Sequence, residues 1–183
     1  MGISTFPAPA GAGVYPTWTQ LGFTNPSGLT SFTFSSLGGY KYIKVVGIMF
    51  NTTNSATNLR LRINADSTAA MYINGNVTYS GSTSVISART SGPTTGFDLG
   101  SYSTSASDNV IEIEFINPTQ TDGKKMIKYN FTGNDGGTNR QHIGDGVYNS
   151  NSAITSIVFS STNSYAFESG NGATTGFYVY GAN

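Results

Sequence analysis

The single histidine, His142, is the first residue to consider for catalysis. A Ser-His-Asp hydrolase would need it as the general base, but no serine lies in the Gly-x-Ser-x-Gly pattern that presents a nucleophile between a strand and a helix. One histidine without any cysteine also supplies too few ligands for a zinc site of the usual kind. We therefore expect His142 to be a surface or interface residue, and a hydrolase is the third of three hypotheses.

Two glutamates, Glu112 and Glu114, are the closest approach to a catalytic carboxylate pair. A retaining glycosidase needs two carboxyl groups about 5 Å apart on opposite sides of a sugar. Residues two apart on a strand point to the same side, so these carboxylates cannot straddle a bond. We expect a solvated face on which Glu112 lies opposite Lys128 of the returning strand, a cross-strand pair that contributes about 0.2–1 kcal/mol.

Calcium could use Asn134 with Asp135, or Asn64 with Asp66, but neither loop has the alternating oxygen ligands of an EF-hand. Two glycine-rich stretches lack the lysine and the following helix of a phosphate-binding loop, so we interpret them as turns. They are residues 133–137 and 144–146. No catalytic residue, no metal site and no cofactor is therefore predicted.

The composition excludes several classes of partner. Only 10% of the 183 residues are charged, and nine basic residues balance nine acidic ones. Without a basic patch, nucleic acid has no electrostatic reason to bind. No apolar run reaches the roughly 18 residues that a membrane-spanning helix needs, and the absence of cysteine excludes disulfides. With hydrophobic residues at 37%, much of the core must come from the 11 Phe and 11 Tyr.

The clearest structural signal lies in residues 59–64, where three aliphatic residues alternate with two arginines and an asparagine. Alternation with period two indicates a strand with one buried face and one wet face, which is typical of an antiparallel sheet. The strand should stop at Asn64-Ala65-Asp66-Ser67, because such short polar side chains bond their own backbone in turns.

Similar patterns predict strands throughout the rest of the chain, and no segment has helical periodicity. We expect Asn74-Gly75 to form a tight hairpin turn, and residues 40–50 to pair with residues 59–64 as a hairpin. Together these patterns predict an all-β fold, a two-sheet antiparallel sandwich that is jelly-roll-like. The strongest strand patterns are residues 31–35, 40–50, 59–64, 110–116, 125–131, 154–160 and 177–180, with weaker ones at 71–73, 77–79, 84–87 and 96–99.

Residues 1–20 are predicted to be an extended arm that precedes a sandwich domain of residues 21–183. The segment Phe6-Pro7-Ala8-Pro9 cannot be helical, because proline lacks the amide donor and biases its predecessor toward extended backbone. Three aromatic residues lie in the arm, and such rings dominate buried contacts. We expect them to anchor the arm on the body or on a neighbouring chain: Phe6, Tyr15 and Trp18.

The order of several motifs resembles that of small bacteriophage virion proteins. The alternating strand, the Asn64-Ala65-Asp66-Ser67 turn and Tyr72 are similar to a pattern of strand, Asn-x-Asp-Ser/Thr and tyrosine in those proteins. The end of the chain, with its aromatic strand before Gly181, and the opening, with Trp18 before Phe32-Thr33-Phe34, also look similar. The resemblance implies a β-sandwich component of the virion, located on the capsid or in the tail and its fibres, without catalytic residues.

Two hypotheses follow from this resemblance. The first is a capsid decoration or cement protein that binds the major capsid protein, stabilises the assembled shell, and associates with itself, most simply as a homotrimer. The alternative is a tail-fibre or receptor-binding module for host surface glycan, because aromatic rings stack on sugars while amides bond hydroxyl groups. The candidate glycan contacts are Tyr102, Asn134, Tyr148 and Tyr165.

Overall fold

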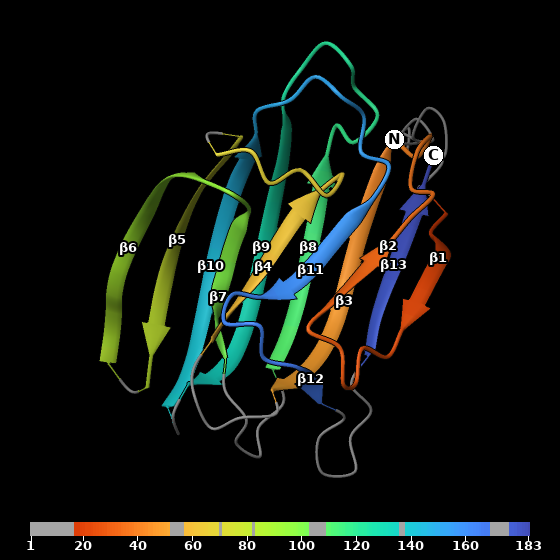
Figure 1. Ribbon diagram of the computed structural model, residues 1–183. Coiled ribbons are helices and arrows are strands. Elements are labelled where there is room, and N and C mark those ends of the chain that lie inside the picture. The colour runs from red at the N-terminus through yellow and green to blue at the C-terminus, as the bar shows by residue number, and fades with distance from the viewer. Residues whose placement is uncertain are drawn as a thin grey trace, which may run out of the picture.

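The computed structural model describes residues 17–51, 57–69, 71–81, 83–102, 109–135, 138–168 and 176–183, with strands and no helix among them (Figure 1). The strands are β1 Thr19–Thr24, β2 Ser31–Phe34, β3 Tyr42–Asn51, β4 Thr57–Ile63, β5 Tyr72–Ser80, β6 Thr83–Thr94, β7 Phe97–Tyr102, β8 Asn109–Ile116, β9 Lys125–Asp135, β10 Thr138–Tyr148, β11 Ile157–Ser161, β12 Phe167–Glu168 and β13 Gly176–Ala182.

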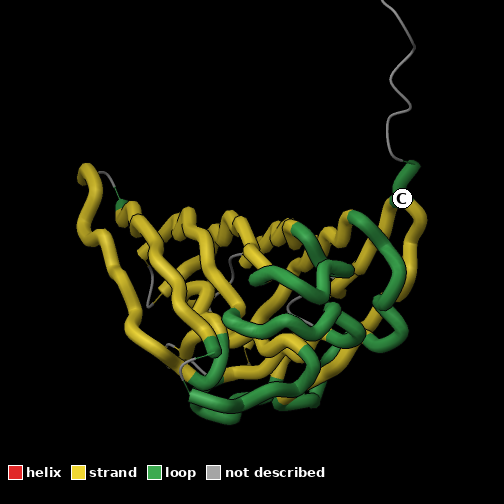
Figure 2. Tube along the Cα trace, turned by 90° about the horizontal axis from the view of Figure 1, so that it is seen from above, coloured by secondary structure: helices red, strands yellow, loops and turns green. Residues whose placement is uncertain are grey.

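The strands form two sheets that pack face to face. The larger has nine strands in the order β1-β13-β3-β8-β9-β10-β5-β6, with β12 beside β3, and the smaller has the order β2-β11-β4-β7. Figure 2 shows the large sheet as a broad layer with the small sheet and most loops on one side of it. All pairings between these strands are antiparallel. The predicted all-β sandwich is therefore confirmed, whereas a jelly-roll order is not.

The core between the sheets follows from the alternation of side chains. In β8 buried residues alternate with exposed ones up to the half-buried last residue, and β4 alternates between buried and half-buried residues. Aromatic rings fill much of the space, as the composition predicts. Phe32 of the small sheet lies with its ring centroid 5.2 Å from that of Phe159 and 4.7 Å from that of Phe177, which belongs to the large sheet. These rings bury apolar area from both sheets at once and so join the two layers.

The predicted hairpin between residues 40–50 and 59–64 is wrong. β3 lies in the large sheet between β13 and β8, whereas β4 lies in the small sheet between β11 and β7. The chain therefore crosses from one sheet to the other between two strands that follow each other in sequence. Both strands have an apolar face, and two such faces can be buried against each other across the sandwich as well as side by side in one sheet.

The predicted Asn74-Gly75 turn is also wrong, because both residues lie inside β5 and the hairpin to β6 turns after Ser80. The stretch 144–146, predicted as a turn, lies in the middle of β10. Its glycines have a packing role: a Cβ at Gly144 would collide with the Tyr129 ring, and one at Gly146 would lie 2.5 Å from the Phe97 ring. Of the stretch 133–137, residues 133–135 belong to β9, and the other two lie outside the described residues.

The boundary of the predicted arm needs one correction. Thr19 and Gln20 belong to β1, which forms the edge of the large sheet and pairs with β13. The sandwich thus begins within the segment that was assigned to the arm. Phe6 and Tyr15 lie outside the described residues, and of the three predicted anchors only Trp18 is described.

Candidate functional site

Three of the four predicted glycan contacts are buried. Tyr102 is fully buried at the end of β7, Asn134 is 5% exposed, and Tyr148 is 3% exposed. Burial also raises the pKa of the Tyr102 phenol. The prediction that these three side chains present themselves to a ligand is wrong, because each faces the interior at the end of a strand. Tyr165 is half-buried in the segment between β11 and β12.

His142 is buried between the sheets, 5% exposed, and is not the surface or interface residue that was predicted. Its Nδ1 lies 2.9 Å from the Thr78 hydroxyl oxygen, and its ring stacks on Phe131 with centroids 5.6 Å apart. The residue comes from β10, whose inward face packs toward β7. A buried imidazole in this position packs against Phe131, and its Nδ1 bonds the Thr78 hydroxyl and not the serine or carboxylate of a triad.

Glu112 and Glu114 share the outer face of β8, as predicted, but the partner of Glu112 is Lys44 of β3 and not Lys128. Lys44 Nζ also lies 4.0 Å from Glu114 Oε1. In the β8–β9 register, Glu114 is opposite Lys128, while Glu112 is opposite Asn130. The prediction was displaced by two residues along β9, because the ladder begins with Ile116 opposite Met126 and the connection is longer than the predicted pairing requires. The pair is a partly exposed structural ion pair.

The Asn64-Ala65-Asp66-Ser67 turn forms a tightly bonded corner of the fold. Asn64 and Ala65 both have a left-handed backbone, with φ of 54° and 55°. The Asn64 side-chain oxygen accepts hydrogen bonds from the backbone amides of Thr155 (2.8 Å) and Ser156 (3.1 Å), while its amide group donates to the Ala153 carbonyl (2.8 Å). One asparagine thus ties the end of β4 to the segment that leads into β11.

Two tyrosines complete this corner. The Tyr72 hydroxyl donates to the Asp66 carbonyl at 2.7 Å and accepts from the Ile63 amide at 3.1 Å. Tyr148 donates to Asp66 Oδ2 at 2.8 Å, and the Thr68 amide donates to Asp66 Oδ1 at 2.8 Å. The Thr68 amide is the main reason why the pKa of Asp66 lies below its usual value.

This corner carries the residues of the family resemblance, yet its polar groups are used to hold the fold. Both oxygens of the Asp66 carboxylate accept protein hydrogen bonds, one from the Thr68 amide and one from the Tyr148 hydroxyl. Across the described ranges, no three His, Cys, Asp or Glu side chains gather closely enough to bind a metal. We therefore look for a ligand site elsewhere.

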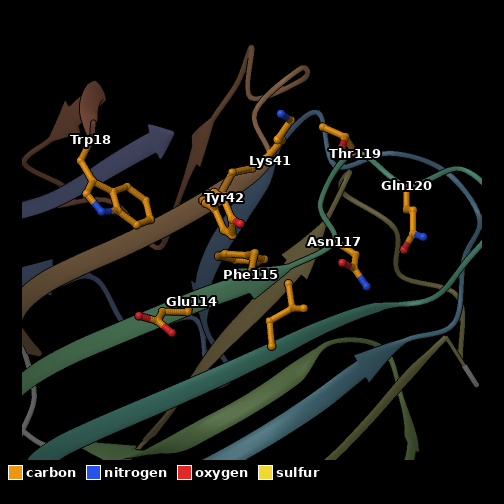
Figure 3. Close-up of a pocket in the computed structure, with 10 residues that line it drawn as sticks. Trp18, Lys41, Tyr42, Glu114, Phe115, Asn117, Thr119 and Gln120 are labelled. Atoms are coloured by element: carbon orange, nitrogen blue, oxygen red, sulfur yellow. The ribbon is translucent and has the colours of Figure 1, made fainter. Parts of the chain in front are cut away.

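A pocket of about 490 Å³ lies at one end of the large sheet (Figure 3). Two aromatic side chains are well exposed at it, Trp18 at 43% and Tyr42 at 50%. Trp18 and Tyr42 line one side, and polar residues of the β8–β9 loop line the other, as Figure 3 shows. The lining residues are Trp18, Lys41, Tyr42, Ile43, Glu114, Phe115, Ile116, Asn117, Thr119 and Gln120.

The sheet brings these residues together from distant parts of the chain. Thr19 pairs with Gly181, and Ala182 pairs with Tyr42, so Trp18, which directly precedes β1, and Tyr42 of β3 lie at about the same level on either side of β13. The β8–β9 loop is held in place on the other side. Asn117 has a left-handed backbone with φ of 58°, and the Pro118 carbonyl accepts a hydrogen bond of 2.7 Å from the Ile154 amide. The pocket is therefore preorganised on at least two sides.

The chemistry of this pocket suits a ligand with flat apolar faces and hydroxyl groups. Two exposed rings offer stacking surfaces. Within the described part of the chain, the side chains of Asn117, Thr119 and Gln120 make no hydrogen bond to another residue. Their amide and hydroxyl groups can both donate and accept. Lys41 and Glu114 bring one charge of each sign, so the pocket has no strong preference for an ion.

The sequence analysis found one of these residues and missed the others. Trp18 was predicted as an anchor of the arm, and the structure places it at the pocket. The alternation of residues 40–44 could have indicated that Tyr42 and Lys44 share a face. No pattern in the sequence indicates that residues 117–120 lie beside Trp18, because that proximity depends on the order β1-β13-β3-β8.

Among the described residues there is no helix that is long and apolar enough to cross a membrane. Comparison of the chain with known protein families and with curated proteins finds no match in either. The geometry of the pocket and the motif resemblance are therefore the two grounds on which a function can be proposed.

Proposed function

We propose that this protein is a non-enzymatic, glycan-binding component of a bacteriophage virion, a receptor-binding or tail-associated module that holds sugar at the Trp18 pocket. The observation that carries the proposal is the pairing of two exposed rings with a rim of amide and hydroxyl side chains. A pyranose has an apolar face that stacks on such rings and equatorial hydroxyls that bond such a rim. The motif resemblance supplies the viral context.

The pocket favours binding over catalysis. A hydrolase of glycans needs a carboxylic acid and a second carboxylate on opposite sides of the scissile bond. Glu114 is the one carboxylate among the residues that line the pocket. It lies 4.0 Å from Lys44 Nζ on an exposed sheet face, and the lining residues offer no second carboxylate across the pocket from it.

A glycan array that carries bacterial surface oligosaccharides tests the proposal. We expect the protein to bind a subset of neutral glycans, and Trp18→Ala to weaken that binding roughly 2- to 12-fold, because one stacking face is lost. Ile143→Ala is the matched control, since Ile143 is 45% exposed on the same sheet but lies on β10, away from the pocket. Equal losses in both variants, or no binding to any glycan, would contradict the proposal.

Capsid decoration is the second candidate. Four partly exposed apolar residues lie in register across the outer face of the large sheet, as a docking surface on a capsid would require: Ile116, Met126, Val147 and Ile73. The number of copies per particle separates the candidates. On the order of hundreds of copies would favour decoration, whereas a small multiple of three or six would favour the tail. Deleting residues 1–16, which ends before β1, tests the arm's role in particle binding.

The homotrimer stays a prediction. Light scattering of the purified protein over a dilution series measures it directly, and melting over the same series should shift if association stabilises the fold. A monomer at all micromolar concentrations, with a dilution-independent melting temperature, would remove the trimer of the free protein from the proposal.

A further inference from the structure

The outer face of β1, β13 and β3 carries aromatic rings beyond the pocket. At the first level Trp18 and Tyr42 flank Ala182, at the second Gln20 and Lys44 flank Tyr180, and at the third Phe23 and Val46 flank Tyr178. Successive levels are two residues apart along β13, about 6.6–6.8 Å. We name these five rings the aromatic track: Trp18, Tyr42, Tyr180, Tyr178 and Phe23.

The rings of the track lie close together and are accessible. Phe23 and Tyr178 have ring centroids 4.7 Å apart, and Tyr178 and Tyr180 stack at 6.4 Å with an interplanar angle of 20°. Phe23 is 46% exposed and Tyr178 is 38% exposed, although rings of this size normally contribute to cores. The end of the track remote from Trp18 is therefore as open as the pocket itself.

A second hollow marks that remote end. A depression of about 340 Å³ is lined by Val46, Gly47, Ile48, Gly176 and Tyr178. The track thus runs from the pocket at Trp18, over Tyr180, to this depression beside Tyr178. Two hollows joined by a line of rings indicate an elongated ligand and not a single sugar.

The charges on this face balance. Lys44, which flanks Tyr180, is bonded to Glu112 and lies near Glu114, and Lys41 lies at the pocket, so two basic and two acidic groups leave no net charge that would attract an anionic polymer. The rings of the track add no Asp, Glu, Lys or Arg to this face. A ligand that complements this face is uncharged, with flat faces that repeat along its length.

We propose that the aromatic track is an extended site for a neutral, linear oligosaccharide of at least three sugar units, with one end in the Trp18 pocket. This inference rests on the proposed glycan function and specifies its ligand class. Sugar rings stack on the aromatic faces, and the Gln20 side chain together with the phenol groups of Tyr178 and Tyr180 bonds the hydroxyls. On a stacking surface of this kind, each additional sugar ring that contacts an aromatic ring increases the affinity.

Affinity as a function of oligosaccharide length tests the inference. The probes are α1,4-linked glucose, β1,4-linked glucose and β1,4-linked N-acetylglucosamine oligomers of one to six units, measured by calorimetry on the full chain. We expect affinity in at least one series to rise with length up to three units or more. Tyr178→Ala should lower the affinity for the long oligomers roughly 2- to 12-fold and leave the affinity for single sugars unchanged. Ile143→Ala should change neither.

The possible outcomes distinguish this inference from the proposed glycan-binding function on which it rests. Binding that depends on Trp18 but not on length or on Tyr178 overturns the track and leaves the glycan pocket intact. Binding of no series overturns the track, and the glycan array then decides on the pocket. Light scattering measures the mass of the assembly in solution. If Tyr178→Ala forms an assembly of a different mass, the track is a contact between copies of the chain, which also overturns the inference. Thermal unfolding of Tyr178→Ala shows whether the variant is folded.

Discussion

The corner at Asn64 and the pocket at Trp18 use the same kinds of residue for opposite purposes. In the corner, the polar groups are bonded to the protein itself. Tyr72 and Tyr148 donate hydrogen bonds to Asp66, the Asn64 side chain accepts one from the Thr155 amide, and Tyr72 is fully buried. In the pocket, Trp18 and Tyr42 are about half exposed, and Asn117 and Gln120 have side chains without protein partners in the described structure.

The difference shows that residue types alone do not identify a binding site. Asparagine, aspartate and tyrosine in close sequence are equally suited to closing a corner and to holding a sugar. What distinguishes the two regions is whether the polar atoms are already satisfied inside the protein. A satisfied and buried network stabilises the fold, whereas an unsatisfied and exposed set is available to a ligand.

The largest expected effect is on the corner. Asn64→Ala should lower the free energy of unfolding by about 2–3 kcal/mol, because two backbone amides and a carbonyl lose their partner and alanine disfavours the left-handed backbone. Asn117→Ala is the matched control, since Asn117 has a similar φ of 58°. It should cost about 1 kcal/mol, near the lower end of the backbone cost alone. Urea unfolding measures both, and equal losses would mean that the corner's hydrogen bonds contribute nothing.

The next effect concerns one hydroxyl group. Tyr72→Phe should lower the free energy of unfolding by about 1–2 kcal/mol, because the Asp66 carbonyl and the Ile63 amide both lose a bond to a buried phenol. Tyr42→Phe removes the same atom from an exposed ring and should change stability by less than about 0.5 kcal/mol. If Tyr42→Phe proved the more destabilising, the contrast between corner and pocket would be reversed.

The contrast also explains how far the sequence could predict this molecule. The strands at residues 59–63, 110–116 and 177–180 are correct because period-two alternation follows from the geometry of any half-buried sheet. The pairing of β3 with β4 was wrong because partners are chosen by contacts between distant segments. The resemblance selected Asn64, Asp66 and Tyr72, and these residues matter, but to the corner.

The site was less predictable than the fold. Tyr102, Asn134 and Tyr148 have the right chemistry for sugar, yet their positions at the inner face of strands bury them. Trp18 and residues 117–120 become neighbours only through β13 and β3. Which of these side chains is exposed depends on the order of strands in the sheets, and no local sequence pattern encodes that order. The candidate site could therefore be identified only from the structure.

A smaller effect should appear in acid. The pKa of Asp66 is lowered in the folded protein, first by the Thr68 amide, so the folded state holds its proton less tightly than the unfolded state, whose ordinary value is 3.8. The stability that this carboxylate contributes is present above the unfolded value and is lost as the pH falls through the folded value. Asp66→Asn should therefore flatten the decline of stability below about pH 4. Urea midpoints from pH 6 to pH 2 measure this, and an unchanged slope would contradict the role of Asp66.

The smallest effect on stability is expected in the pocket, and it is the sharpest test of the contrast. Gln120 lies on an exposed loop, and its side chain makes no hydrogen bond in the described structure. Gln120→Ala should change the free energy of unfolding by less than about 0.5 kcal/mol. The same substitution should weaken glycan binding several-fold, because a neutral hydrogen bond to a ligand is worth about 0.5–1.5 kcal/mol. Tyr72→Phe should show the reverse pattern, with lower stability and unchanged affinity at a temperature where it is folded. If Gln120→Ala and Tyr72→Phe each changed both stability and affinity, the corner and the pocket would form one coupled unit. The proposal that the corner stabilises the fold while the pocket binds the ligand would then be wrong.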